Sequence, residues 1–135
     1  MKRLTKTERE QVRLKFGGRC AYCGEELGKR WHADHLEAVR RRHELYRDEK
    51  GRHQARVVGA DFEERHVLDN MMPACAPCNI SKAAYSLERW RDVLVGYVGA
   101  LHRNNPTYRV AKKHGLIAET VKPVVFYFET LEGGK

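Results

Sequence analysis

Residues 70–82 have the sequence NMMPACAPCNISK and contain the second of two Cys-x-x-Cys pairs in the chain. The first pair is Cys20 and Cys23, and the second is Cys75 and Cys78. Glycines surround the first pair and prolines the second, and both residue types are typical of turns. Zn²⁺ prefers four tetrahedral ligands, and four thiolates leave no coordination position open for a substrate. The two pairs therefore predict one structural zinc site that joins two distant segments.

Other uses of the cysteines fit less well. Disulfides form in oxidising compartments, and the first seven residues, MKRLTKT, lack the apolar region of a secretory signal. A redox Cys-x-x-Cys motif needs only one pair. The separation of the two pairs exceeds the roughly 15–20 residues of a simple zinc ribbon. We therefore expect an inserted segment between the two halves of a shared zinc site.

The composition favours a single basic domain. The chain has 135 residues, with 26 Lys and Arg against 18 Asp and Glu, which gives a net charge of +8. A basic surface favours nucleic acid or another polyanion as partner, and the alternative is a soluble basic protein without such a partner. No apolar run approaches the roughly 20 residues of a membrane span. We expect one domain over residues 1–135, located in the cytoplasm and without a membrane partner.

The N-terminal half contains a predicted helix, a short extended segment and a charged insert. Thr7 and Glu10 match a capping box, which predicts a helix that ends at about Phe16. Residues 31–34 have an extended pattern. Residues 36–66 carry eight Lys and Arg against seven Asp and Glu, and we interpret them as an inserted helix or mobile loop with a turn at 48–51.

The C-terminal half shows helical periodicity and then an apolar run. A helix is predicted from about Asn79, with a core-facing stripe formed by Leu87, Trp90, Leu94, Tyr97 and Leu101. Asn105 as cap and Pro106 as first residue predict another helix, which ends at Gly115. The apolar residues 124–128 follow Pro123 and predict a final strand, so the C-terminal helix and strand cover about 105–129.

Three polar residues near the cysteine pairs suit phosphodiester hydrolysis. His35 has the residue type of a general base that activates water near neutral pH, since its unperturbed pKa is about 6.5. Asp34 and Asn79 offer hard oxygen ligands, which suit Mg²⁺ or Mn²⁺ at the growing charge and the leaving oxygen. The zinc site explains how these residues converge, because it ties the segment of Asp34 and His35 to that of Asn79.

The constellation of Asp34, His35 and residues 70–82 resembles the HNH endonucleases, in particular their small zinc-stabilised members in bacteria and phages. The resemblance covers about residues 16–95. It implies an α+β fold with a ββα-metal (His-Me finger) core and flanking helices, cleavage of DNA, and a bacterial or phage-encoded protein. Two features depart from the family pattern. Residues 36–39 lack the usual proline and glycine, and Asn79 stands where many members have histidine.

The resemblance also implies roles for further residues. Asn70 bridges the backbone and holds the loop of the base, so its role is positional, and the alternative is a turn residue. His32 assists at the metal or orients Asp34. Lys82 contacts the scissile phosphate or is a solvated helix charge. The basic residues Arg40, Arg41 and Arg42 contact a duplex backbone, or else they pair along a helix face with Glu37, Glu44 and Asp48. The remaining histidines are expected at the surface or in packing: His43, His53, His66, His102 and His114.

Two other functions stay open. The first is a non-catalytic zinc-knuckle module that binds nucleic acid, for which the basic charge and the zinc site suffice. The second is an accessory protein of phage packaging that acts with terminase. The trio of Asp34, His35 and Asn79 favours the endonuclease, because a protein that only binds has no need to assemble it.

Overall fold

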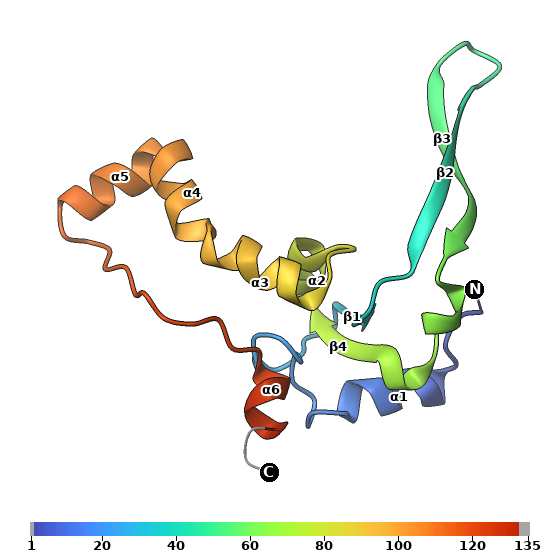
Figure 1. Ribbon diagram of the computed structural model, residues 1–135, viewed down its shortest axis with the longest axis horizontal. Helices are drawn as coiled ribbons and strands as arrows, with labels where there is room; N and C mark the ends of the chain where they lie inside the picture. The colour runs from blue at the N-terminus through green and yellow to red at the C-terminus, as the bar shows by residue number, and fades with distance from the viewer. Residues whose placement is uncertain (1, 133–135) are drawn as a thin grey trace.

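The computed structural model describes residues 2–132, and its strands form two separate antiparallel pairs. Figure 1 shows β1, β4 and α2 in a central body, from which the β2–β3 hairpin and the α4–α5 helices project in different directions. The expected α+β class is confirmed, whereas the ββα-metal identity of the body stays a prediction. The elements in chain order are α1 (Lys6–Leu14), β1 (Trp31–His35), β2 (Arg40–Arg47), β3 (His53–Asp61), η1 (Glu63–Arg65), η2 (Leu68–Asn70), β4 (Met71–Cys75), α2 (Ala76–Lys82), α3 (Leu87–Val95), α4 (Tyr97–Asn104), α5 (Pro106–Lys113) and α6 (Tyr127–Glu132).

The β1–β4 pair forms the centre of the body and confirms the extended segment predicted at residues 31–34. The register runs from Trp31 opposite Cys75 to His35 opposite Met71. Neighbouring residues of a strand point to opposite faces. Met71 therefore packs with Val12 of α1 and with Trp31, whereas Met72 joins the larger core on the other face. Both faces of this short ribbon are covered.

The larger core is built from aromatic rings. Tyr22, from the first cysteine loop, packs edge-on against Trp90 of α3, with 5.0 Å between ring centroids. Trp90 stacks on Phe126 of the C-terminal segment at 4.9 Å. The predicted core role of Trp90 is confirmed, since the residue is 1% exposed. Three segments far apart in the sequence thus share one core beside the cysteines.

The first helix begins two residues earlier than predicted. The capping box is formed by Thr5 and Glu8, because the Thr5 hydroxyl accepts from the Glu8 amide and the Glu8 carboxylate accepts from the Thr5 amide. Thr7 and Glu10 fit the same pattern, but Glu10 pairs with Arg13 instead. The helix ends at Leu14, shortly before the expected end.

The inserted segment is a β-hairpin, so the helix or mobile loop predicted for residues 36–66 is wrong. β2 and β3 pair along their whole length, and both strands are exposed over nearly all residues. The predicted turn at 48–51 is confirmed. The Asp48 carboxylate accepts from the amides of Lys50 and Arg52, each at 2.9 Å. Gly51 has a φ of 75°, a conformation that favours glycine.

The long helix predicted from Asn79 is three helices, α2, α3 and α4. Ala83 ends α2 with a positive φ of 48°, and Ser86 caps α3 by accepting from an amide of its first turn. As a result, Tyr97 and Leu101 of the predicted stripe are 43% and 41% exposed and do not join the core. The cap at Asn105 and the following helix α5 are confirmed. None of the helices in residues 2–132 has the length and apolar character that a membrane crossing requires.

The apolar residues 124–128 do not form the predicted strand. The amides of Tyr127 and Phe128 donate to the carbonyls of Tyr22 and Ala21, at 3.0 and 2.8 Å. These two carbonyls belong to the cysteine loop, which is too short to pair with a full strand. Helix α6 begins at Tyr127, so the two residues that make this contact form its first turn.

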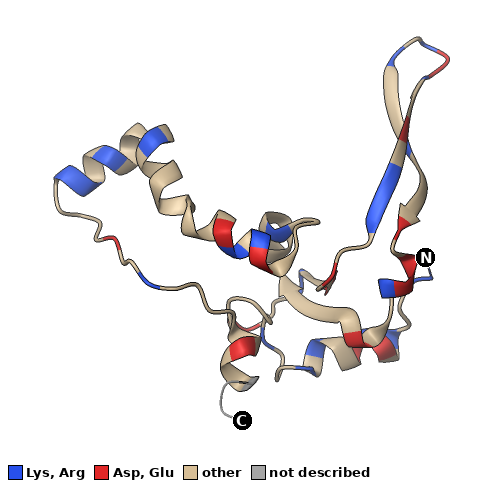
Figure 2. Ribbon diagram, in the orientation of Figure 1, with Lys and Arg blue, Asp and Glu red and all other residues tan. Residues whose placement is uncertain are grey.

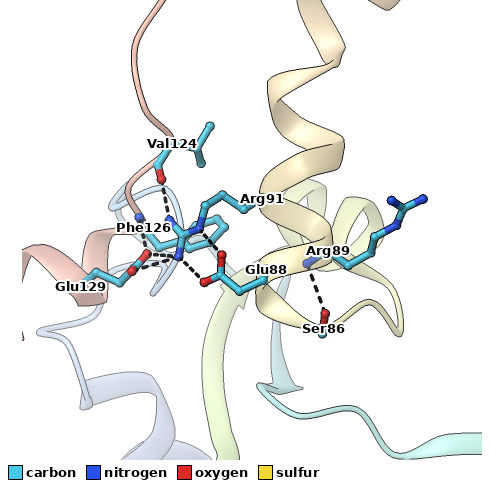
Figure 3. A network of polar contacts seen from close by, with 7 residues as sticks. All are labelled: Ser86, Glu88, Arg89, Arg91, Val124, Phe126 and Glu129. Carbon is cyan, nitrogen blue, oxygen red and sulfur yellow. Dashed lines mark hydrogen bonds and ion pairs between the residues drawn. The ribbon is translucent and has the colours of Figure 1, made fainter.

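Arg91 of α3 fixes this C-terminal segment to the body (Figure 3). Its guanidinium donates to the Val124 carbonyl at 2.5 Å and to both oxygens of Glu129 at 2.9 and 3.0 Å. It also pairs with Glu88 and lies over the Phe126 ring, 4.7 Å from its centroid. The neighbouring Arg89 points away from this network.

Candidate functional site

The four cysteines form a cluster that could hold a metal ion such as zinc. Their sulfur atoms all lie within 4.8 Å of one another, and the Sγ atoms of Cys23 and Cys75 are 3.8 Å apart. A tetrahedron of thiolates with Zn–S bonds of about 2.3 Å has edges of about 3.8 Å. A disulfide would place two sulfur atoms about 2.05 Å apart. The spacing of the thiols therefore fits a shared cation.

The thiols shift one another's pKa values in opposite directions. A hydrogen bond from Cys78 lowers the pKa of Cys20 to about 4, whereas burial raises the pKa of Cys23 to about 11. The hydrogen bond with Cys20 also raises the pKa of Cys78. Without a cation these shifts favour the thiolate at Cys20 and the protonated thiol at Cys23 and Cys78. A divalent cation bound by four thiolates would release these protons.

Asp34 is buried on the side of β1 that faces the aromatic core. It is 8% exposed, and its Oδ2 atom accepts from the Tyr22 hydroxyl at 2.5 Å and from Lys82 Nζ at 3.0 Å. Lys82 has no exposed surface and also donates to the His35 carbonyl at 2.8 Å. The prediction of a phosphate contact or solvated charge for Lys82 is therefore wrong. Its amine instead compensates a buried carboxylate, as buried charges require.

The surroundings of Asp34 do not fit a divalent ion held with Asn79. One carboxylate oxygen already accepts from two donors, and a buried ammonium balances the charge that would attract the ion. Asn79 lies half-buried on α2, and within residues 2–132 its side chain makes no hydrogen bond with Asp34 or His35. The contacts of these two residues therefore do not support a catalytic ion shared between them.

Asn70 bridges the two segments on either side of the hairpin. Its side-chain oxygen accepts from the Glu37 amide at 2.9 Å, and its Nδ2 donates to the carbonyls of Glu37 and Arg65 at 2.9 and 2.8 Å. Its own carbonyl accepts from the Leu36 amide at 2.8 Å. These contacts fix the chain directly after His35.

His35 points to the face of β1 opposite Asp34 and bonds to His66. The His35 Nε2 and His66 Nδ1 atoms are 2.9 Å apart, and His66 Nε2 lies 2.6 Å from the Lys2 carbonyl. A carbonyl only accepts, so His66 Nε2 carries a proton. When both rings are neutral, His66 Nδ1 then accepts from His35 Nε2–H, which leaves the lone pair on His35 Nδ1.

Burial lowers the pKa of His35 below its ordinary value, and the neighbouring His66 lowers it further. The neutral ring is therefore favoured near pH 7. Neutral imidazole is the form that accepts a proton, as a general base must.

An open cavity of about 830 Å³ borders His35 and is rich in cations. His32 and His66 also line it. His32 is exposed and, within residues 2–132, makes no hydrogen bond to Asp34. The cavity has four cationic lining residues and one acidic one, namely Lys2, Arg3, Arg9, Arg41 and Glu63. Such a lining attracts anions.

The three adjacent arginines occupy different environments on β2. Arg41 lines the cavity of His35, and Arg42 pairs with Asp61 of β3 at 3.3 Å. Arg40 is exposed and shares the face of Arg42. The alternative pairing along a helix face is wrong, because this segment is a strand and its acidic residues pair elsewhere: Glu37 with Arg65, Glu44 with Arg56 and Asp48 with Arg52.

Two residues of this site had no recognised role in the sequence. Tyr22 lies between Cys20 and Cys23. This position between two predicted metal ligands was the only feature of the sequence that could have pointed to a role for Tyr22 in the site. His66 was expected at the surface or in packing, yet it is half-buried and bonded to His35. Comparisons with models of protein families, with curated proteins and with solved structures give no match for this chain.

Proposed function

We propose that this protein is a DNA endonuclease of the HNH type, in which His35 is the general base of phosphodiester hydrolysis. The observation that carries the proposal is the position of His35. Its ring borders a cavity lined by four cations, and its bond to His66 leaves Nδ1 as the proton acceptor. A polyanion and a base-activated water can meet there.

The reaction follows from these groups. His35 Nδ1 takes a proton from water, the hydroxide oxygen bonds to phosphorus, and the bond from phosphorus to the leaving sugar oxygen breaks. The leaving oxygen takes a proton from solvent. Arginine and lysine side chains stabilise the negative charge that grows on the phosphoryl oxygens. Arg41 and Arg3 line the cavity and are suited to this role.

The neighbouring residues support the base. Asn70 holds the chain after His35 by hydrogen bonds to Glu37 and Arg65, and Lys82 holds the His35 carbonyl. In this proposal the cysteine cluster holds a structural Zn²⁺, which fastens the first cysteine loop to the start of α2. A site with four thiolates has no open position for substrate.

A catalytic Mg²⁺ or Mn²⁺ at Asp34 and Asn79 is part of the family pattern but does not fit the contacts of Asp34. The proposed reaction therefore depends on His35 and the cationic cavity. The requirement for a divalent ion is decided separately, by the effect of EDTA on cleavage.

The second candidate is a nucleic-acid binding module without catalysis. Three specific contacts favour it. Asp34 Oδ2 accepts from Tyr22 and Lys82, and His35 is bonded to His66, so both groups are engaged within the protein. In this case the cationic cavity serves binding alone.

Nicking of supercoiled plasmid separates the two candidates. The protein is incubated with plasmid in Mg²⁺, in Mn²⁺ and in EDTA, beside the variant His35→Ala. The endonuclease predicts nicking that His35→Ala slows by roughly 10²–10⁴-fold. A parent protein that binds the plasmid but nicks it under none of the three conditions establishes the binding module instead.

A further inference from the structure

The two faces of the β2–β3 hairpin differ in charge compensation. Alternation along β2 and the register with β3 assign each side chain to one face. The face that we call the open face consists of Arg41, His43, Leu45 and Arg47 with their partners Ala60, Val57, Ala55 and His53. The face that we call the paired face consists of Arg40, Arg42, Glu44 and Tyr46 with Asp61, Gly59, Arg56 and Gln54.

The paired face compensates its charges internally. Arg42 pairs with Asp61 at 3.3 Å, and Arg56 pairs with Glu44 at 3.0 Å. The Arg56 guanidinium also lies over the Tyr46 ring, 4.8 Å from its centroid. This face therefore presents little uncompensated charge to a partner.

The open face contains no acidic residue. Among residues 2–132, no ion pair involves Arg41 or Arg47. Between them lies Leu45, which is 81% exposed, and across the strand lies Val57, which is 55% exposed. Exposed apolar side chains flanked by free cations contribute nothing to the core of this protein and are suited to contact with a partner.

The open face continues into the cavity of His35. Arg41, Val57 and Ala60 belong to this face, and all three line that cavity. The rest of the hairpin projects from the body, with basic residues along β2 (Figure 2). A ligand bound along the open face would therefore extend to the proposed general base, His35.

The chemistry and shape of the open face match duplex DNA. Arginines contact phosphates and release counterions. The major groove of B-form DNA is about 12 Å wide and admits a two-stranded β-ribbon, and apolar side chains contact the methyl group of thymine there. The deep and narrow major groove of A-form RNA does not admit side chains.

We propose that the hairpin enters the major groove of duplex DNA with its open face. Arg41 and Arg47 then contact phosphates, while Leu45 and Val57 face base edges. The choice of DNA rests on the proposed function. The assignment of the contact to one face rests on the ion pairs and exposures of the hairpin alone.

Two double variants with equal loss of charge test this proposal. Arg41→Ala with Arg47→Ala changes the open face, and Arg42→Ala with Arg56→Ala changes the paired face. Affinity for a labelled 20-base-pair duplex is measured by fluorescence anisotropy in EDTA at several salt concentrations, so that cleavage plays no part. Circular dichroism checks that each variant is folded.

We expect the open-face variant to lower the slope of log affinity against log salt by roughly 1.8, since each phosphate contact contributes about 0.9. The paired-face variant should change the slope by less than half as much. Leu45→Ser should weaken binding and leave the slope unchanged, because it removes an uncharged contact.

Equal slopes in the two double variants overturn the proposal, as does a parent that fails to bind the duplex at 50 mM salt. Equal affinity for single-stranded DNA of the same length also overturns it, since a single strand has no groove. These outcomes are independent of catalysis. Nicking of plasmid together with equal slopes would support the proposed function and overturn this inference. The expected slopes without nicking would support this inference and contradict the proposed function.

Discussion

The chain contains two antiparallel strand pairs, β1–β4 and β2–β3, with opposite environments. The short β1–β4 pair is covered by α1 on one face and by the aromatic core on the other. The longer β2–β3 pair is exposed on both faces. A two-stranded hairpin without a packed face is marginally stable in water. The body is therefore stabilised by burial. The hairpin buries little of its own surface, which agrees with the proposed contact with DNA.

Among the changes considered, loss of a metal from the cysteine cluster should destabilise the body most. Binding of structural zinc contributes about 10–16 kcal/mol in zinc-finger peptides, and a domain is stable by only about 5–15 kcal/mol. We expect Cys75→Ser, or excess chelator, to unfold the body, as followed by circular dichroism during a thermal melt. Mass spectrometry should find one zinc per parent chain. A metal-free protein with an unchanged melt contradicts the role of the cluster.

Lys82→Met should cause the next largest loss of folding stability, because it leaves the Asp34 carboxylate buried without its cation. Breaking a buried ion pair costs about 3–5 kcal/mol. The matched control is Lys50→Met, the same change at the exposed turn of the hairpin, which should stay within about 0.5 kcal/mol of the parent. Urea unfolding measures both variants. Similar free energies of unfolding for the two would show that Lys82 is not a buried partner of Asp34.

Arg91→Ala should lower the free energy of unfolding by a smaller amount, about 1–3 kcal/mol. The change removes hydrogen bonds to Val124 and Glu129 at the edge of the core. Arg89→Ala is the control, because Arg89 lies on the same helix and points away from the network (Figure 3). Proteolysis with trypsin should also release the C-terminal segment faster from the Arg91 variant. Equal stability of the two variants would remove Arg91 as the residue that fixes this segment.

Local patterns in the sequence predicted the elements that local chemistry determines. The paired cysteines indicated the cluster, and Asn105 with Pro106 indicated the start of α5, because these residues act on their immediate neighbours. The hairpin was not predicted. Its balanced charge resembled a solvated segment, and the bulge at Val58 interrupts the alternation that marks a strand.

The contacts of the candidate site depend on tertiary packing. Lys82 is one turn beyond Asn79 on a helix, and nothing in its local sequence indicates that its amine is buried against Asp34. His66 lies far from His35 in sequence and meets it only because the hairpin returns the chain to β1. Neighbours in a strand, such as Asp34 and His35, point to opposite faces, so the expected shared site is divided between two sides of β1.

The rate of DNA cleavage by His35→Ala, measured together with its DNA affinity, tests the central claim most directly. General-base catalysis contributes roughly 10²–10⁴-fold, so the variant should cleave plasmid slower by that factor. Its affinity for duplex DNA in EDTA should match the parent, because the cationic residues of the cavity and the hairpin remain. A variant that cleaves as fast as the parent contradicts the assignment of His35 as the base.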